Sequence, residues 1–283
     1  MLKYKTETVG IKKESASLRF LYNTAVGRLL LRPLISRAVS DLCGSFLDSG
    51  VSKPLIGQFV RKYSIDLDDY EICEYNSFNE FFTRKVKCDR RPIDTDPSAL
   101  ISPCDGLLSA YHITEDTVIP VKQSRYTISS LLGGDPRAEN FRNGLCLVFR
   151  LCVDNYHRYC YIDAGTVGES VFIKGRLHTV RPIALESAPV FTENCREYTI
   201  IETENFGEIA QIEVGAMLVG KIQNHRGRRC VMRGEEKGMF LYGGSTVIVL
   251  LQEGRADLPE EIFDATRNQA EIPVRMGQKI GQK

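Results

Sequence analysis

The sequence predicts an α+β protein in which amphipathic N-terminal helices precede a single β-rich body. Three observations favour this class. Apolar residues recur at helical spacing before residue 50, short segments rich in β-branched and aromatic residues dominate after residue 99, and no repeat or clear linker separates two large domains. We therefore expect residues 1–50 to form a helical segment and residues 51–283 to form one α+β domain.

The N-terminal segment combines basic charge with helical periodicity. Between residues 11 and 40, six basic residues stand against one acidic residue, Glu14. We expect one helix over residues 17–31, a second that begins at Pro33, and a stop near Gly50. Such helices suit the headgroup layer of an anionic membrane, where each Lys or Arg contributes about 1 kcal/mol. The alternative is that they cover the protein core or a dimer partner.

Beyond residue 50 the pattern changes from helix to strand. A further helix is expected over residues 55–70, and the charged stretch that follows it is typical of a solvated surface. The expected strands are residues 145–153, 158–162, 170–173, 198–202, 209–214, 217–222 and 246–251.

Composition excludes several classes of protein. With 43% apolar residues the 283-residue chain can bury a substantial core, and a net charge of +1 argues against nucleic-acid binding as the main activity. The nine cysteines include no C-x-x-C pair, and we see no secretory signal, so we expect reduced thiols in a cytoplasmic protein and neither disulfides nor a metal site. No apolar run approaches the roughly 18 residues of a membrane-spanning helix.

The tripeptide Gly243-Gly244-Ser245 precedes the apolar run of residues 246–251. A serine hydroxyl in a strained glycine turn can add to the carbonyl before it. An N-to-O acyl shift and β-elimination then leave an N-terminal pyruvoyl group. A buried strand would anchor one side of this bond, although Gly-Gly-Ser before a strand is by itself more often an ordinary turn.

Four histidines are candidates for acid–base chemistry. His157 lies among polar residues just after an apolar strand and is the first choice. His178 could line the same cavity, whereas His112 and His225 lie at strand ends or in loops and are interpreted as surface residues.

Several segments, in this order, resemble the phosphatidylserine decarboxylase family of pyruvoyl enzymes. They are SFNEFFTRKV (77–86), RRPID (90–94), SPCDGLLS (102–109), DNYHRYC (154–160), GRLHTVRP (175–182) and GGST (243–246). The resemblance implies a zymogen that cuts itself autocatalytically between Gly244 and Ser245 into a β chain, 1–244, and an α chain, 245–283, with Ser245 converted to the pyruvoyl cofactor.

The resemblance also implies a lyase of phospholipid biosynthesis. The pyruvoyl ketone would form a Schiff base with the amine of phosphatidylserine and accept electrons as carbon dioxide leaves, and phosphatidylethanolamine would be released without pyridoxal phosphate. We accordingly expect a phospholipid substrate and peripheral binding to the cytoplasmic face of a bacterial-type cell membrane. The α and β chains would stay together, with a homodimer as a further option.

Site residues follow from the same resemblance. Self-cleavage in the family resembles a serine-protease relay, in which Asp105 would orient a histidine that deprotonates Ser245, while His157 would return a proton during decarboxylation. The family's second histidine is replaced here by Cys160, a poorer base at neutral pH. Three alternatives stay open: His157 serves both steps, His178 swings in, or Cys160 acts as a thiolate.

One further departure and three alternative functions remain. Arg181 stands where the family usually has Asn; it could meet a substrate carboxylate or phosphate, or be exposed. The chain could be a pyruvoyl decarboxylase of a soluble amino acid, which would not need basic helices, or a homologue impaired by Cys160. A biotinyl or lipoyl carrier would fit the layout of residues 209–251, but the turn lacks a lysine at its tip.

Overall fold

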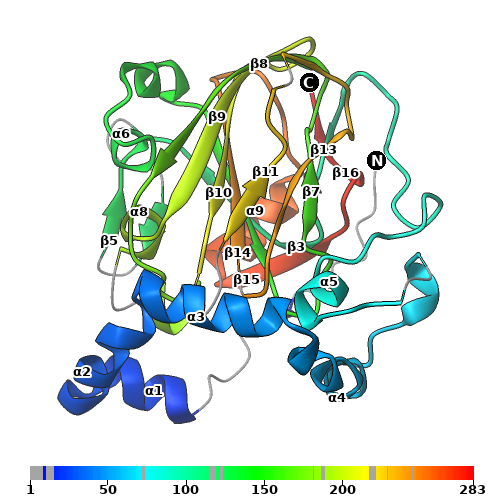
Figure 1. The fold of residues 1–283 in the computed structure, drawn as a ribbon. Helices are drawn as coiled ribbons and strands as arrows, with labels where there is room; N and C mark the ends of the chain where they lie inside the picture. The colour runs from blue at the N-terminus through cyan, green and yellow to red at the C-terminus, as the bar shows by residue number, and fades with distance from the viewer. Residues whose placement is uncertain are drawn as a thin grey trace.

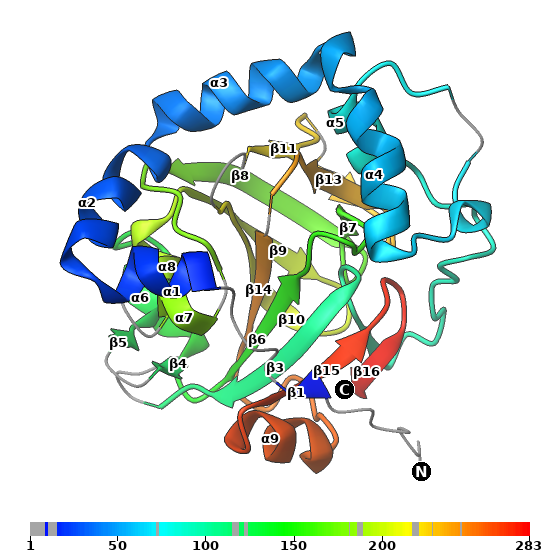
Figure 2. The same cartoon turned by 90° about the horizontal axis from the view of Figure 1, so that it is seen from below.

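The computed structural model describes residues 9–10, 16–71, 74–114, 119–121, 124–180, 182–185, 189–216, 221–227, 229–243 and 245–283. Helices come first and strands dominate afterwards, so the predicted α+β class is confirmed. Figures 1 and 2 show the N-terminal helices gathered at one end of the β-rich body. These helices are α1 (Ala16–Asn23), α2 (Ala25–Leu34), α3 (Arg37–Asp48), α4 (Pro54–Tyr63) and α5 (Phe78–Phe82).

The helix boundaries differ from those expected. Residues 17–31 do not form one helix, because Thr24 leaves the helical conformation and its hydroxyl accepts a hydrogen bond from Gly27 N at 2.9 Å, which caps α2. Pro33 lies inside the end of α2 and does not open a helix; Ser36 caps α3 instead. The helix expected over residues 55–70 ends at Tyr63, followed by Ser64 in the left-handed conformation.

A nine-stranded antiparallel sheet forms the centre of the body, in the order β1-β15-β3-β6-β14-β10-β9-β8-β12. Its strands are β1 (Val9–Gly10), β3 (Gly106–His112), β6 (Leu145–Leu151), β8 (Gly165–Ile173), β9 (Arg196–Thr203), β10 (Gly207–Val214), β12 (Cys230–Val231), β14 (Ser245–Leu251) and β15 (Ala270–Val274). A second sheet of three strands contains β7 (Arg158–Cys160), β11 (Ile222–Asn224) and β13 (Glu236–Phe240).

Smaller elements complete the fold. Two further two-stranded antiparallel sheets pair β2 (Ala99–Ile101) with β16 (Lys279–Gln282) and β4 (Ile119–Val121) with β5 (Ser124–Tyr126). The remaining α-helices are α6 (Ile128–Leu131), α7 (Pro182–Leu185), α8 (Val190–Glu193) and α9 (Glu260–Arg267). Each of the predicted strands corresponds to an observed one, except that residues 217–220 lie outside the described part and β11 begins only at Ile222.

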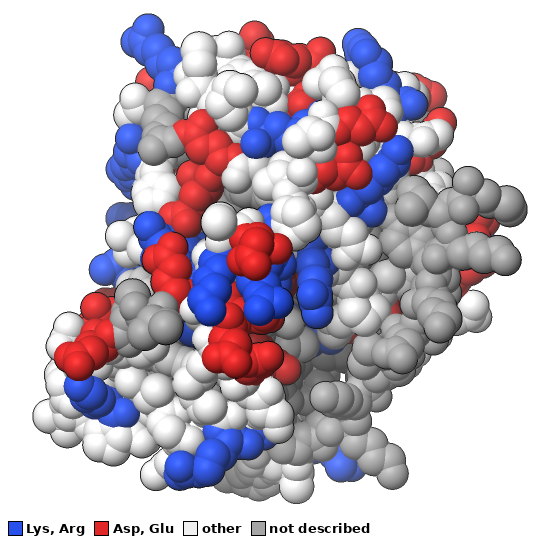
Figure 3. Space-filling view, turned by 90° about the vertical axis from the view of Figure 1, so that its right-hand side faces the viewer, with Lys and Arg blue, Asp and Glu red and all other residues white. Residues whose placement is uncertain are grey.

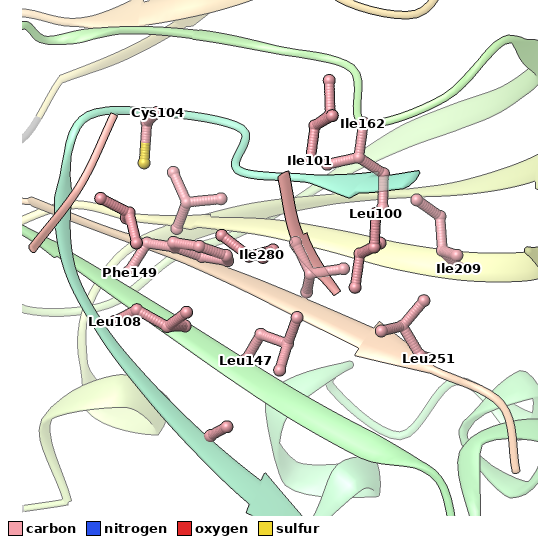
Figure 4. Close-up of a cluster of buried hydrophobic side chains, with 14 of the residues drawn as sticks. Leu100, Ile101, Cys104, Leu108, Leu147, Phe149, Ile162, Ile209, Leu251 and Ile280 are labelled. Atoms are coloured by element: carbon pink, nitrogen blue, oxygen red, sulfur yellow. The ribbon is translucent and has the colours of Figure 1, made fainter. Parts of the chain in front are cut away.

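The central sheet buries both of its faces. On one face, Val249 and Leu251 of β14 pack with Ile209 and Phe149, as the close-up in Figure 4 shows for the labelled members of this cluster. On the other face, Ile248 and Leu250 join a second cluster under α6 and α8. Because β14 is covered on both sides, its sequence is a continuous apolar run and does not alternate.

The N-terminal helices pack against the body on one side only. Tyr22, Leu31 and Ile35 belong to a core cluster that includes Val180 and Val190 of the body. The opposite side of α2 and α3 leaves large apolar residues in solvent, among them Leu29 and Leu42. The helices therefore cover the core, as one of the two interpretations expected, and also keep an exposed apolar face.

Charge is distributed evenly on at least one side of the molecule. On the face shown in Figure 3, lysine and arginine side chains lie among aspartate and glutamate side chains. This mixture agrees with the near-neutral net charge of +1 for the whole chain.

Candidate active site

Ser245 is the first residue of β14 and is fully buried. It pairs with Leu151 of β6, and its Oγ has no hydrogen-bond partner among the described residues. Gly244, the predicted cleavage neighbour, lies outside those residues. Gly243 has a φ of 137°, a conformation that side chains with a Cβ rarely adopt, so a glycine is required there. The turn thus presents a buried, unbonded hydroxyl directly after a glycine-dependent bend.

Asp105 lies at the same end of the sheet as Ser245. Leu107 of β3 pairs with Arg150, and Leu151 pairs with Ser245, so the start of β3 is about two strand spacings, roughly 10 Å, from Ser245. Asp105 directly precedes β3. The sheet register therefore brings together two of the three predicted catalytic residues, which are 140 positions apart in the sequence.

The Asp105 carboxylate is buried and held by its own set of partners. Arg91 donates from Nε to Oδ1 at 2.8 Å and from Nη2 to Oδ2 at 2.6 Å, and Met276 N donates to Oδ1 at 2.9 Å. A cavity of about 390 Å³ opens beside this pair and is also lined by Tyr70, Asn155 and Arg275. In the part of the chain that is described, no hydrogen bond joins Asp105 to a histidine, so the predicted relay is not assembled.

His157 is fully buried beside the glycine turn. Its ring packs against Phe82 with a centroid separation of 4.1 Å, and Nδ1 lies 2.9 Å from the Asn155 carbonyl oxygen. Burial lowers the pKa of His157 to about 3, and the charge of Arg84 acts in the same direction, whereas polar contacts with the backbone of Asn155 and Gly243 oppose the shift.

These contacts define the chemical state of the His157 ring. Because its pKa is so low, the ring is neutral at physiological pH, and the Asn155 carbonyl, which can only accept, favours the tautomer with the proton on Nδ1. Nε2 then carries the free lone pair, and it has no hydrogen-bond partner among the residues described. A neutral imidazole with an unoccupied acceptor nitrogen can accept a proton, and its pKa of about 3 makes it a weak base while the ring is fully buried.

Cys160 is a buried thiol next to the loop that carries Asp105. Its N–H donates to the Pro103 carbonyl at 2.8 Å, which ties β7 to that loop. Burial raises the pKa of Cys160 to about 12, and the charges of Glu236 and Asp105 add to the effect. The thiol is therefore protonated at neutral pH.

His178 has other partners than those expected. Its Nδ1 lies 3.4 Å from the Tyr22 hydroxyl of α1, and its Nε2 lies 3.3 Å from Glu193 Oε2. Burial lowers the pKa of His178, while the Glu193 charge raises it. His178 thus belongs to the junction between α1 and the body, and Arg181, three residues later, lies outside the described residues.

Sequence reasoning missed the partners that hold these groups in place. Arg91 lies in the motif RRPID, but nothing in the motif showed that it binds Asp105. It also missed a buried ion pair between Glu213 and Lys237 on the same face of the sheet as Ser245. A signal existed, since Glu213 interrupts the apolar strand sequence IAQIEV and a buried glutamate requires a partner.

The described residues contain neither a metal-binding cluster nor a membrane-spanning helix. No group of three or more His, Cys, Asp or Glu side chains is arranged there to hold a metal ion. No described helix has both the length and the apolar character needed to cross a bilayer.

Comparison with known proteins gives one family. The family model described as phosphatidylserine decarboxylase matches residues 78–282. Phosphatidylserine decarboxylase proenzyme 2 of Clostridium acetobutylicum is 43% identical over 270 residues, which cover 95% of this chain and 92% of the relative. Phosphatidylserine decarboxylase proenzymes of Clostridium botulinum (strain Alaska E43) and Clostridium beijerinckii are each 38% identical over 286 residues, covering 99% of this chain and 96% of each relative.

The buried state of His157 predicts a specific acid sensitivity. The unfolded chain binds a proton at this residue near pH 6.5 and the folded chain only near pH 3, so stability falls as the pH is lowered through this window. In a Ser245→Ala background, which is predicted to keep the chain whole, His157→Gln should reduce the loss of unfolding free energy between pH 7 and pH 4 by about 3 kcal/mol.

Urea denaturation at a series of pH values measures this difference. The exposed His112→Gln is the control and should retain the acid sensitivity of the parent. Equal pH slopes for the His157→Gln variant and its parent would show that His157 is not held neutral by burial.

Proposed function

The chain belongs to the phosphatidylserine decarboxylase family and therefore forms phosphatidylethanolamine from phosphatidylserine after self-processing, and we propose that Ser245 is the residue that cuts the chain and becomes its pyruvoyl cofactor. One observation carries this proposal: the Ser245 hydroxyl is fully buried and lacks a hydrogen-bond partner among described residues, at the start of a strand and after a positive-φ glycine. An unbonded buried hydroxyl costs about 1–3 kcal/mol, which is explained if it is kept free to react.

Family membership weakens the alternative functions. The relatives carry the name of a phospholipid decarboxylase, so a soluble amino acid substrate and a biotinyl or lipoyl carrier have no support among them. The remaining alternative is a homologue that Cys160 prevents from cutting itself. The cleavage experiment described below distinguishes it from an active enzyme.

The site fits the chemistry of a pyruvoyl group. When formed, this group supplies a ketone that takes up the substrate amine and accepts electrons as carbon dioxide leaves. Ser245 lies between β6 and β10 in a region closed to solvent, which keeps water from the reacting atoms. The residues of the chain then have to move protons and place the substrate.

We assign His157 as the base of self-cleavage. Its neutral ring contacts the backbone of Gly243, two residues before Ser245, and Nε2 is free to accept the hydroxyl proton. The same nitrogen can later hold the proton that returns to the substrate. Cys160 remains a thiol with a pKa of about 12, and His178 is engaged by Tyr22 and Glu193. Of the three alternatives, a single histidine for both steps has the best support.

Asp105 has a different role in this proposal. Arg91 binds both of its oxygens, and among the described residues no histidine is hydrogen-bonded to this carboxylate, so in this structure it does not orient the imidazole. We assign Asp105 as a positioning residue that holds the loop before β3 to Arg91 and to the backbone of Met276.

The N-terminal helices are proposed to bind an anionic membrane from the cytoplasmic face. The exposed fractions of Leu29 and Leu42 are 63% and 71%. Several apolar side chains exposed together on one face are typical of a surface that binds a membrane or another protein. Other large exposed apolar residues at this end include Phe20, Val26, Leu30, Phe46 and Val51. Exposed arginines accompany them at positions 19, 28, 32 and 37, which would pair with lipid phosphates.

Self-cleavage can be tested by intact mass. Purified wild-type protein should separate into chains of 244 and 39 residues, the shorter one resistant to Edman sequencing and reactive with a carbonyl reagent. Ser245→Ala should remain one chain without that reactivity, because the attacking hydroxyl is missing. The control Ser109→Ala, at a buried serine of β3, should be cut as in the wild type. Cleavage of Ser245→Ala, or an uncut wild type after incubation with phosphatidylserine vesicles, contradicts the proposal.

The identity of the base can be tested by the rate of cutting. His157→Ala should slow the appearance of the two chains by about 100-fold or more, the size expected for loss of a general base. Cys160→Ala and His178→Ala should be cut at close to the wild-type rate. If Cys160→Ala alone stays uncut, the thiol is the base and the assignment of His157 is wrong.

Membrane binding can be tested with vesicles of anionic phospholipid. Leu29→Glu combined with Leu42→Glu should weaken sedimentation with vesicles by about 100-fold or more, because each leucine would bury roughly 1.5–3 kcal/mol of apolar surface in the membrane. Met232→Glu changes an equally exposed apolar residue on the β12–β13 turn and should bind as the wild type does. Equal binding by all three proteins rejects this face as the membrane contact.

A further inference from the structure

Three ionic side chains that the assigned proton transfers do not use are buried on one face of the central sheet. They are Glu197 of β9, Glu213 of β10 and Lys237 of β13, each no more than 3% exposed. We call these three residues the ionic cluster. Burying charge is costly unless it is paired, so the arrangement of the cluster requires an explanation.

Glu213 has a complete set of partners. Lys237 Nζ donates to both of its carboxylate oxygens, at 2.6 and 2.8 Å, and Asn224 Nδ2 donates to Oε2 at 3.0 Å. Asn224 is held in turn by the Tyr159 hydroxyl, which donates to its Oδ1 at 2.8 Å. This pair is internally balanced and needs nothing more.

Glu197 is not balanced in the same way. The antiparallel register places it directly opposite Glu213, so two carboxylates face a single ammonium group. Glu197 Oε1 is buried without a hydrogen-bond partner among the residues that are described. The ionic cluster therefore holds two carboxyl groups for one ammonium group and has one free acceptor atom, which is complementary to a cation that can donate hydrogen bonds.

The free acceptor lies on the same face of the sheet as Ser245. Glu213 pairs with Val247, two residues from Ser245, and side chains two apart on a strand share a face. Ile201, Ile209 and Val249 lie further along these strands, an even number of residues from Glu197, Glu213 and Ser245, and therefore on the same face. They pack together in one core cluster. By strand spacing and rise, the Cα atoms of Glu197 and Ser245 are about 12 Å apart.

We propose that Glu197 is the subsite for the primary ammonium group of the substrate. This inference rests on the proposed function, which places a ketone at position 245. Glu197 binds the incoming ammonium, and one proton passes from the nitrogen to a carboxylate oxygen. The nitrogen lone pair is then free to form a bond to the ketone carbon, and the ketone oxygen leaves as water. Glu213 keeps its bonds to Lys237 throughout, so the Glu197 carboxylate alone receives the cation.

The test compares a cationic with an uncharged nucleophile. Ethanolamine is protonated at neutral pH and needs the carboxylate, and its condensation product can be trapped by cyanoborohydride, which supplies hydride, and measured as an added mass on the 39-residue chain. Hydroxylamine is mostly uncharged at the same pH and needs no proton acceptor. The variant is Glu197→Gln, because Glu213→Gln would leave Lys237 buried without its partner. The matched control is Glu202→Gln, at an exposed glutamate on the same strand.

Glu197→Gln should be cut into two chains and should react with hydroxylamine as the wild type does. The ethanolamine adduct of this variant should form more slowly by about tenfold or more, the loss expected when one charge-assisted hydrogen bond disappears. Glu202→Gln should match the wild type with both reagents.

Two results overturn the inference. Equal ethanolamine trapping by Glu197→Gln and wild type shows that the carboxylate does not bind the ammonium. Equal loss of reactivity with both reagents shows that Glu197 supports the site structurally without recognising charge. A wild type that stays uncut and does not react with hydroxylamine is a separate outcome, since it removes the ketone and rejects the proposed function together with this inference.

Discussion

The position of β14 in the sheet is the constraint on which the rest of the structure depends. This strand pairs with β6 on one side and β10 on the other, and all seven of its residues are buried. Ser245 is its first residue, so the hydroxyl is held at the point where an ordered strand meets a glycine turn. The strand fixes one side of the 244–245 bond, and the conformation of Gly243, which favours glycine, bends the chain on the other.

Buried polar groups around this point fall into two kinds. Asp105 and Glu213 have full sets of partners in Arg91, Met276, Lys237 and Asn224, and they hold loops and strands together. The Ser245 hydroxyl, His157 Nε2 and Glu197 Oε1 are buried without a hydrogen-bond partner in the described ranges, as are the nearby Thr246 Oγ1 and Gln211 Oε1. Proteins seldom leave such atoms unbonded, so the second kind contains the candidates for chemistry and substrate binding.

Local patterns in the sequence predicted several residues of this site. The contacts between segments that are distant in the sequence could not be predicted from it. The apolar run after Gly244 and the polar neighbours of His157 are visible within a few residues, and both were recognised from the sequence. The pairing of Arg91 with Asp105 and of Lys237 with Glu213 joins segments 14 and 24 residues apart in the sequence, and no local pattern encodes it. His178 was expected to share a cavity with His157, but its ring lies by Tyr22 and Glu193, because α1 packs there. The breaks at Thr24 and Ser36 were missed because capping hydroxyls outweigh apolar periodicity at helix ends.

The strand order has a consequence for the life of the processed protein. The 39-residue product contains β14, α9, β15 and β16, which are distributed over the middle of the large sheet, its margin and a separate strand pair. A break at 244–245 would therefore leave two polypeptides interwoven through one hydrophobic core. Folding of the precursor is unimolecular, but reassembly of its products would require a bimolecular encounter of two unfolded pieces. Maturation would thus convert a reversible equilibrium into a one-way state, whose persistence is set by the height of the unfolding barrier.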